Sequence, residues 1–194
     1  MNYALLSVSN KSGIVDFAKS LVGIGYTIIS SGGTHAVLQA EGIPVIRVSD
    51  YTGSPEILDG RVKTLHPKIH GGILAQRDNS SHDLDRKVNR IELIDIVAVN
   101  LYPFKETVAK PDVTLADAIE NIDIGGPSMV RSAAKNFKDV AVLTNPNQYG
   151  IYLDSIKGNI SIEPEDLRKQ FLKDAFIHTA EYDATISTWM EDNV

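Results

Sequence analysis

The sequence predicts an α/β fold in which helices cover both faces of a five-stranded parallel sheet. Short aliphatic runs alternate along the chain with segments whose apolar residues recur every three to four positions. These runs are almost continuously apolar, as expected for strands buried on both faces. Of the 194 residues, 43% are hydrophobic and 23% are charged, which is typical of a folded globular chain.

The expected elements follow one another in a regular order. Strands are predicted at Tyr3–Val8, Tyr26–Ser30, Val45–Val48, Asp95–Asn100 and Asp139–Thr144. Helices are predicted after Ser12-Gly13, from the Ser31–Thr34 segment through Ala40, and at Thr114–Asn121 and Pro127–Asn136. Gly23 and Gly25 are natural stop signals for the first helix.

The last part of the chain has a different pattern. From Glu163 onward, apolar residues recur at helical spacing as far as Met190, which predicts one long helix or two broken ones. We therefore expect a domain at residues 1–160 and a helical extension at 161–194. This extension either packs on the sheet or leads to a second domain.

Composition excludes several classes of protein. Nineteen Lys and Arg against 25 Asp and Glu give a formal charge of −6, which disfavours general binding of nucleic acids or anionic membranes. The absence of cysteine excludes disulfides, thiolate metal sites and cysteine nucleophiles. No apolar run approaches the ~20 residues of a membrane span, and the N-terminal segment lacks a signal-peptide pattern. A cytoplasmic protein is therefore expected.

Polar loops follow several of the predicted strands. In parallel sheets, ligands bind outside the carboxyl ends of the strands. This rule marks Ser7–Ser12, Ser30–Thr34, Asn100–Phe104 and Thr144–Asn147 as the expected rim of a site. Within it, Ser31-Gly32-Gly33-Thr34 joins a strand to a helix and could hold a phosphate on helix N–H groups and hydroxyls. A tight turn without a ligand remains the alternative, because the loop contains neither GxGxxG nor GxxxxGK[ST].

Three further segments carry candidate chemistry. Gly60–His70 has five basic or imidazole side chains and no acid, which favours anion binding or proton transfer. A metal site there is not expected, because Pro67 opposes the helix that would align His66 with His70. Tyr102 could stack on a planar ligand or move a proton, and Asp123 is either a turn or cap residue or part of the site.

Five motifs together resemble a known family. SVSNKSG, SSGGT, GRVKTLHPKIHGG, NLYPF and IDIGG followed by RSAAKN are similar to the IMP cyclohydrolase portion, the N-terminal part, of bifunctional purine-biosynthesis enzymes. That family couples AICAR transformylase to IMP cyclohydrolase, and the resemblance extends from Tyr3 to Met190. It implies a methylglyoxal-synthase-like three-layer fold and a transferase domain after residue 194. Transformylase activity is not expected from these residues themselves.

The resemblance also implies a reaction and a site. The family closes the purine ring of a formamidoimidazole-carboxamide ribotide, a phosphate monoester, to give IMP and water, without a metal or other cofactor. The implied catalytic residues are Lys135, Asp123, Lys63 and Tyr102. The implied nucleotide-binding residues are Ser9, Asn10, Lys11, Ser31, Gly32, Gly33, Thr34, Arg61, Val62, Lys63, Thr64, Val99, Asn100, Asp123 and Ile124. A homodimer is left open, and no nucleic-acid or membrane partner is expected.

The residue types suit this chemistry. A carboxamide nitrogen is a weak nucleophile, but an intramolecular attack has little orientational entropy left to lose. We expect Lys63 and Lys135 to converge beside Asp123 and share the proton transfers, with N–H groups of residues 123–125 as oxyanion donors. Two alternatives stay open. One is an elimination enzyme of the methylglyoxal synthase type, and the other is a noncatalytic nucleotide-sensing module like that of carbamoyl phosphate synthetase.

Overall fold

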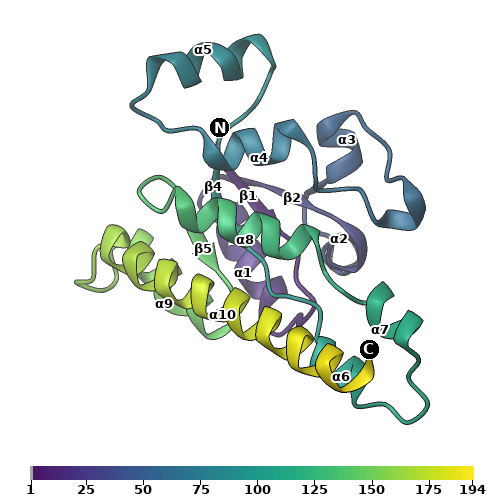
Figure 1. The fold of residues 1–194 in the computed structure, drawn as a ribbon. Coiled ribbons are helices and arrows are strands. Elements are labelled where there is room, and N and C mark those ends of the chain that lie inside the picture. Colours follow the sequence, from purple (N-terminus) through teal and green to yellow (C-terminus); the bar gives the residue numbers. More distant parts are fainter. Residues whose placement is uncertain (1) are drawn as a thin grey trace.

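The computed structural model describes residues 2–194 and contains a five-stranded parallel sheet at its centre (Figure 1). The strands are arranged in the order β3-β2-β1-β4-β5, and every pair is parallel. Their bounds are β1 (Asn2–Leu6), β2 (Tyr26–Ser30), β3 (Val45–Arg47), β4 (Ile94–Ala98) and β5 (Ala141–Leu143). At the middle of the sheet, Leu5 lies opposite Ile29 of β2 and Val97 of β4.

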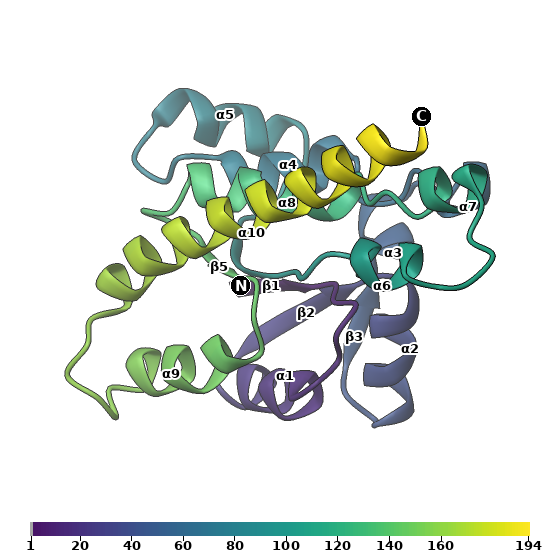
Figure 2. The same cartoon turned by 60° about the horizontal axis from the view of Figure 1, so that its bottom comes forward.

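Helices cover both faces of this sheet, which confirms the predicted three-layer architecture (Figure 2). One face carries α1 (Ile14–Gly23), α2 (Gly32–Ala40) and α9 (Asn147–Ile156). The other face carries α4 (Pro67–Leu74), α8 (Gly125–Lys135) and α10 (Pro164–Asn193). Most residues of the central strands β1 and β4 are buried between these layers, as their largely apolar sequences predict; Asn2 and Asp95 are the exceptions.

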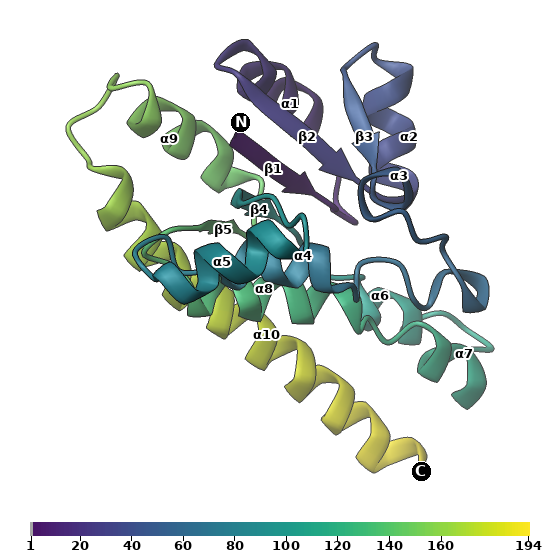
Figure 3. The ribbon, with the colours of Figure 1, turned by 90° about the horizontal axis from the view of Figure 1, so that it is seen from above.

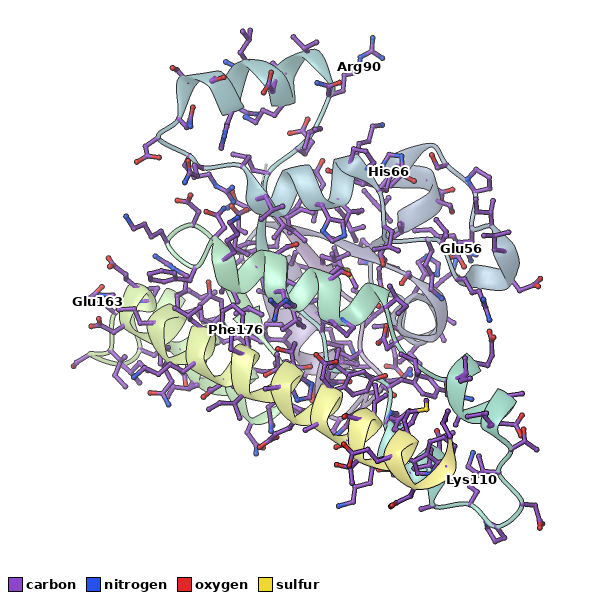
Figure 4. All side chains as sticks on the ribbon, in the orientation of Figure 1. Glu56, His66, Arg90, Lys110, Glu163 and Phe176 are labelled. Carbon is purple, nitrogen blue, oxygen red and sulfur yellow. The ribbon has the colours of Figure 1, made fainter. Side chains whose placement is uncertain are left out.

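Shorter helices lie around the edges of the sheet. They are α3 (Val48–Thr52), a 3-10 turn (Leu58–Gly60), α5 (Ser80–Val88), α6 (Phe104–Val108) and α7 (Leu115–Glu120). None of the residues of α5 is buried, and this helix stands away from the sheet at the top of Figure 1. In Figure 4, Glu56 marks the extended segment that precedes the 3-10 turn, and Arg90 follows α5.

The expectation that Pro67 opposes a helix is wrong. Helix α4 begins at Pro67, and His66 is its N-cap, whose Nδ1 accepts a hydrogen bond from the Lys68 N–H at 3.1 Å. The physical reason is positional. Proline is well tolerated at the first position of a helix, where its missing N–H would have no intrahelical partner. His66 is therefore a cap, and His70 lies one turn further along the same helix.

The C-terminal segment forms one continuous helix, α10, which crosses the molecule diagonally in Figure 3. It packs along α8 and against β5. Its side chains Leu167, Phe171, Ala175 and Tyr182 join the hydrophobic core of the sheet. The expected domain boundary at residue 160 falls in the connection between α9 and α10, and it stays a prediction.

The strand order creates a place for a ligand between β1 and β4. The chain leaves β1 toward one side of the sheet and β4 toward the other, so the two loops diverge at the carboxyl edge. Such a point, where the direction of winding reverses, leaves a crevice in parallel α/β sheets. Separately, no helix among residues 2–194 is both long and apolar enough to cross a membrane.

Candidate active site

A cleft of about 760 Å³ opens at the carboxyl edge of β1, β2 and β4. Three of the four expected rim segments border it: the loops that follow β1, β2 and β4. The fourth, Thr144–Asn147, is not part of its wall. Gln148 Oε1 instead accepts hydrogen bonds from the N–H groups of Thr144 and Asn145, at 2.8 and 3.0 Å, and joins this loop to the start of α9.

The structure brings most of the predicted site residues together in this cleft. Its wall includes Ser9, Lys11, Ser31, Gly32, Gly33, Thr34, Arg61, Lys63, Thr64, Val99, Asn100, Tyr102, Asp123 and Ile124. Asn10 and Val62 are chain neighbours of wall residues without lining it themselves. Glu120 and Met129 also line the cleft and are not among the residues predicted from the sequence. No local motif marks either residue, because each reaches the cleft through the position of its helix.

The glycine loop and two lysines form one end of the cleft. Gly32 has a φ of +52°, a left-handed conformation that favours glycine. Ser31 makes no side-chain capping bond among the described residues, so the N–H groups of the first turn of α2 have no intrahelical partner. A β-carbon at Gly33 would lie 3.6 Å from Lys11 Nζ, and one at Gly32 would lie 4.0 Å from Lys63 Nζ. Two ammonium groups and a helix N-terminus therefore face the same space, which suits an anion.

Two polar side chains in the cleft wall form hydrogen bonds with the backbone of the loop that follows β1. Thr34 Oγ1 accepts a hydrogen bond from the Val8 N–H and donates one to the Val8 carbonyl, both at 2.9 Å. Asn100 Oδ1 accepts from the N–H groups of Ser9 and Asn10, at 2.7 and 2.9 Å, and Asn100 Nδ2 donates to the Asn10 carbonyl at 3.1 Å. Asn100 thus ties the loop after β1 to the end of β4. Both side chains shape the cleft by fixing the backbone.

Asp123 also lines the cleft, two residues before α8 begins. Its Oδ1 accepts a hydrogen bond from the Gly126 N–H at 2.8 Å, so the interpretation of Asp123 as a cap residue is confirmed. Its own N–H donates to the hydroxyl oxygen of Tyr182 at 2.7 Å. Two of the N–H groups at this turn are therefore occupied. Of the N–H groups of residues 123–125 that were expected to bind the oxyanion, that of Asp123 is already bound to Tyr182. The candidates that remain are the N–H groups of Ile124 and Gly125.

The basic segment packs closely on the start of α8. Thr64 is only 3% exposed. A β-carbon at Gly125 would lie 2.7 Å from Thr64 Oγ1, closer than two such atoms can approach, so the packing requires glycine. Thr64 therefore meets the start of α8, while the ammonium group of its neighbour Lys63 lies beside the glycine loop, so the basic segment contacts both.

An ion pair crosses the outer part of the cleft. Arg61 follows the 3-10 turn, and its guanidinium contacts the carboxylate of Glu120 at the end of α7. The hydrogen bond to Glu120 raises the pKa of Arg61, and the same bond lowers the pKa of Glu120. Both groups are well exposed, so water and salt screen their attraction. The guanidinium of Arg61 is thus bound to the carboxylate of Glu120, and both residues line the cleft.

Lys135 lies elsewhere. It occupies the last turn of α8 and lines a separate hollow of about 290 Å³ with Arg77, Lys138 and Asp139. Ten residues of helix separate it from Gly125 at the cleft, a rise of roughly 15 Å. The expected convergence of Lys63 and Lys135 beside Asp123 is not found within one chain. The catalytic role that the resemblance gives to Lys135 stays a prediction.

The remaining predicted residue, Tyr102, faces the cleft with 53% of its surface exposed. Pro103 precedes helix α6 and holds the short loop in place. Among residues 2–194, no group of three or more His, Asp or Glu side chains is arranged to hold a metal ion. The ionisable side chains of the cleft wall are the ammonium groups of Lys11 and Lys63, the guanidinium of Arg61, the phenol of Tyr102 and the carboxylates of Asp59, Glu120 and Asp123.

The fold and the cleft define a class of protein: a parallel α/β domain whose ligand site lies at the carboxyl edge of its sheet and is rich in cations and helix N-termini. Comparison with known families is more specific. A model of the MGS-like domain matches residues 13–128, and a model of the AICARFT/IMPCHase bienzyme matches residues 133–194. The chain belongs to the MGS-like domain family and corresponds to the IMP cyclohydrolase part of the AICARFT/IMPCHase bienzymes. The expected methylglyoxal-synthase-like fold is confirmed.

Individual relatives support this assignment. The chain is 59% identical over 192 residues to the bifunctional purine biosynthesis protein PurH of Synechococcus sp. (strain CC9902), covering 98% of the chain and 37% of that protein. It is 56% identical over 191 residues to PurH of Bacillus cereus (strain B4264), with the same shares covered. The chain therefore spans little more than a third of the length of these relatives. A solved structure, the crystal structure of ForH, superposes with a TM-score of 0.86 at 34% identity and covers 96% of this chain and 95% of its own.

Proposed function

We propose that this chain is an IMP cyclohydrolase, which closes the purine ring of 5-formamidoimidazole-4-carboxamide ribotide to give IMP and water. One observation carries the proposal. The wall of a single cleft contains two ammonium groups, a helix N-terminus and the carboxylate of Asp123. A ribotide has complementary groups, with a dianionic phosphate at one end and the reacting groups at the other.

The phosphate is assigned to the first turn of α2. Lys11 and Lys63 supply charge there, and the N–H groups of Gly33 and Thr34 supply directed donors. This placement gives Lys63 a binding role beside the role in proton transfer that the resemblance implies. The base then extends past Tyr102 toward Asp123, and the formyl group meets the start of α8.

Ring closure forms a bond between the carboxamide nitrogen and the formyl carbon. The carboxamide nitrogen gives up one proton, and the formyl oxygen becomes an alkoxide that takes up one proton to give a hydroxyl group. This hydroxyl group leaves with a second proton as water, while the former formamide nitrogen loses its proton and forms the C=N bond of the new ring. Asp123 Oδ1 is held by the Gly126 N–H, and its carboxylate is assigned as the base that takes the proton from the nitrogen. The N–H groups of Ile124 and Gly125 are assigned to the developing oxyanion. Tyr102 is assigned to the planar face of the base or to a proton transfer.

Three finer statements belong to the same proposal. The enzyme is expected in the cytoplasm, where nucleotide synthesis takes place, and a homodimer remains the candidate assembly. Residues 1–160 are proposed as the catalytic domain, with 161–194 as a helical extension toward a transformylase domain. No transformylase activity is assigned to the residues of this chain.

An ultraviolet assay of ring closure on the formylated ribotide tests the proposed function. The chain should form IMP, and Asp123→Asn should lower kcat by about a hundredfold, the scale of a lost proton-transfer group. The affinity for IMP should change far less in this variant. Tight binding of IMP by a folded chain without turnover would instead identify a nucleotide-sensing module. Turnover of dihydroxyacetone phosphate without turnover of the ribotide would identify an elimination enzyme.

A further inference from the structure

A hydroxyl group from the far end of the chain contacts the backbone of the proposed catalytic carboxylate. Tyr182 Oη, on α10, accepts a hydrogen bond from the N–H of Asp123 at 2.7 Å. The two residues are 59 positions apart in the sequence. Residue 123 lies within the matched MGS-like segment and residue 182 within the segment matched by the bienzyme model. The contact therefore joins the cleft to a helix outside the MGS-like match.

The ring of Tyr182 is held firmly in this position. It is 9% exposed and belongs to the hydrophobic core. Phe104 meets it edge-on with ring centroids 6.5 Å apart, and Trp189 meets Phe104 in the same way at 6.0 Å. Such pairs favour one arrangement of the rings. Since Phe104 begins α6, directly after the loop that carries Tyr102, the same aromatic cluster supports two segments of the cleft.

The hydroxyl group of Tyr182 stays neutral and accepts the hydrogen bond from the Asp123 N–H. Burial raises the pKa of Tyr182, and the negative charges of Asp123 and Asp183 raise it further, while the bond from the Asp123 N–H lowers it. A neutral phenol accepts the N–H without adding a charge beside the carboxylate. At its other end, Asp123 is held by the Gly126 N–H. The backbone and the side chain of Asp123 are thus fixed by two separate partners.

We propose that Tyr182 is a positioning residue for ring closure, whose hydroxyl holds the backbone of Asp123 so that the carboxylate faces the cleft. This inference rests on the proposed function. It makes α10 a necessary part of the active site, although no residue of α10 lines the described cleft. Loss of the hydroxyl should reduce the rate of the chemical step, since the assigned phosphate contacts are made by other residues.

Tyr182→Phe, which removes only the hydroxyl, tests the inference. In the ring-closure assay we expect kcat to fall about tenfold, the factor that corresponds to one hydrogen bond. KM and the affinity for IMP should stay within about twofold. The matched control is Tyr149→Phe, whose buried ring stacks on Phe17 on the other face of the sheet, and it should leave kcat unchanged.

A double-mutant cycle separates positioning from general destabilisation. In the Asp123→Asn background, Tyr182→Phe should lower kcat by less than about twofold, because the group that it positions is already lost. An equal loss of kcat in both backgrounds would overturn the inference, and so would an unchanged kcat in the single variant.

Amide hydrogen exchange at Asp123 gives a readout that does not depend on turnover. The Asp123 N–H should be protected in the wild-type chain, exchange faster in Tyr182→Phe and be unaffected in Tyr149→Phe. An unprotected Asp123 amide in the wild type would overturn the inference even if Tyr182→Phe did not fold. If the wild-type chain fails to close the ring, the proposed function fails by itself. The positioning of Asp123 by Tyr182 is then decided by this exchange measurement alone.

Discussion

At the scale of single residues, the polar side chains of the cleft divide into two groups. The side chains of Asn100 and Thr34 form hydrogen bonds with the backbone of the loop after β1. The ammonium groups of Lys11 and Lys63 lie beside the glycine loop, and that of Lys11 also donates to the carbonyls of Val8 and Ser9, at 3.4 and 3.3 Å. The first group gives the cleft its shape, and the second gives it its charge.

Lys11→Ala and Lys63→Ala test the assignment of the phosphate. Each should weaken the affinity for IMP by about tenfold or more, because a charge-assisted hydrogen bond is lost in each case. The loss should shrink as salt is added, since salt screens the attraction. Isothermal titration calorimetry at two salt concentrations measures both effects.

Lys19→Ala is the control for these two variants. Lys19 lies on α1 and pairs with Glu41 at an exposed position, with 3.4 Å between Nζ and Oε2. Its removal should leave the affinity for IMP within about twofold. Equal affinities for all three variants would place the phosphate elsewhere in the cleft.

At the scale of elements, two helices begin at the cleft and present their N-terminal ends to it. Helix α2 begins at Gly32, within the Ser31–Thr34 segment, and α8 begins at Gly125, two residues after Asp123. Neither N-cap residue, Ser31 or Ile124, makes a side-chain cap bond, but the carboxylate of Asp123 accepts the N–H of Gly126 in the first turn of α8. An uncapped N-terminus is available to an anionic ligand, and a capped one holds its own carboxylate in place.

Gly126→Ala tests how the start of α8 holds Asp123. A β-carbon at Gly126 would collide with the Asp123 carboxylate and lie 2.9 Å from Leu101 Cδ2. The carboxylate must move, so the cap is lost at a cost of about 1 kcal/mol, and kcat should fall at least about tenfold. Urea unfolding and the ring-closure assay measure these two effects.

The matched control is Gly150→Ala in the interior of α9. A β-carbon there meets nothing within 4 Å. This substitution should stabilise the chain by roughly 0.5–1 kcal/mol, since alanine is the better helix former, and should leave kcat unchanged. Full activity and unchanged stability of Gly126→Ala would contradict the proposed role of the turn.

At the scale of the whole molecule, α10 is part of the hydrophobic core and also reaches the active site. Its first half packs through Phe171 against Tyr152 of α9, with ring centroids 6.1 Å apart. Its second half supports Phe104 and Asp123 through Tyr182. A continuous helix of 30 residues can join two distant regions, because its backbone hydrogen bonds keep it straight.

Phe171→Ala tests whether α10 contributes to the core. Phe171 is 3% exposed, so its loss should lower the free energy of unfolding by about 3–5 kcal/mol. The control is Phe176→Ala on the same helix. Phe176 is 40% exposed and lies under the Arg131 guanidinium at 5.4 Å, so its loss should cost only about 1 kcal/mol (Figure 4). Equal small losses in urea unfolding would show that α10 is only loosely attached.

The stability of the molecule should also depend on His70. Burial lowers its pKa, and its Nε2 has no hydrogen-bond partner among the described residues. The unfolded chain therefore binds the proton more readily than the folded one. The contribution of neutral His70 to the free energy of unfolding is fully present above the pKa of an unfolded histidine, about 6.5. This contribution is lost as the pH falls below that value.

Urea unfolding at pH 7.5 and 5.5 measures this dependence. The wild type should lose stability at the lower pH, and His70→Gln should lose less. His178 also has a pKa lowered by burial, so part of the dependence should remain in that variant. An identical pH dependence in both proteins would exclude His70 as its source.

The sequence by itself determined the layers of the fold and most of the cleft wall. Strands that are buried on both faces must be apolar throughout, and this pattern is visible without a structure. The carboxyl-edge rule then placed the loops after β1, β2 and β4 around one site. Gly32 was recognisable for a local reason, because a tight strand-to-helix turn favours glycine.

Only the tertiary structure decided which of these side chains meet. It placed Lys63 beside the glycine loop and left Lys135 at the far end of α8. It also joined Tyr182 to Asp123. Periodicity reports which face of an element is buried, and a motif reports local chemistry. Neither pattern reports the length and direction of the segments that connect one element to the next. Those connections determine which distant residues come into contact.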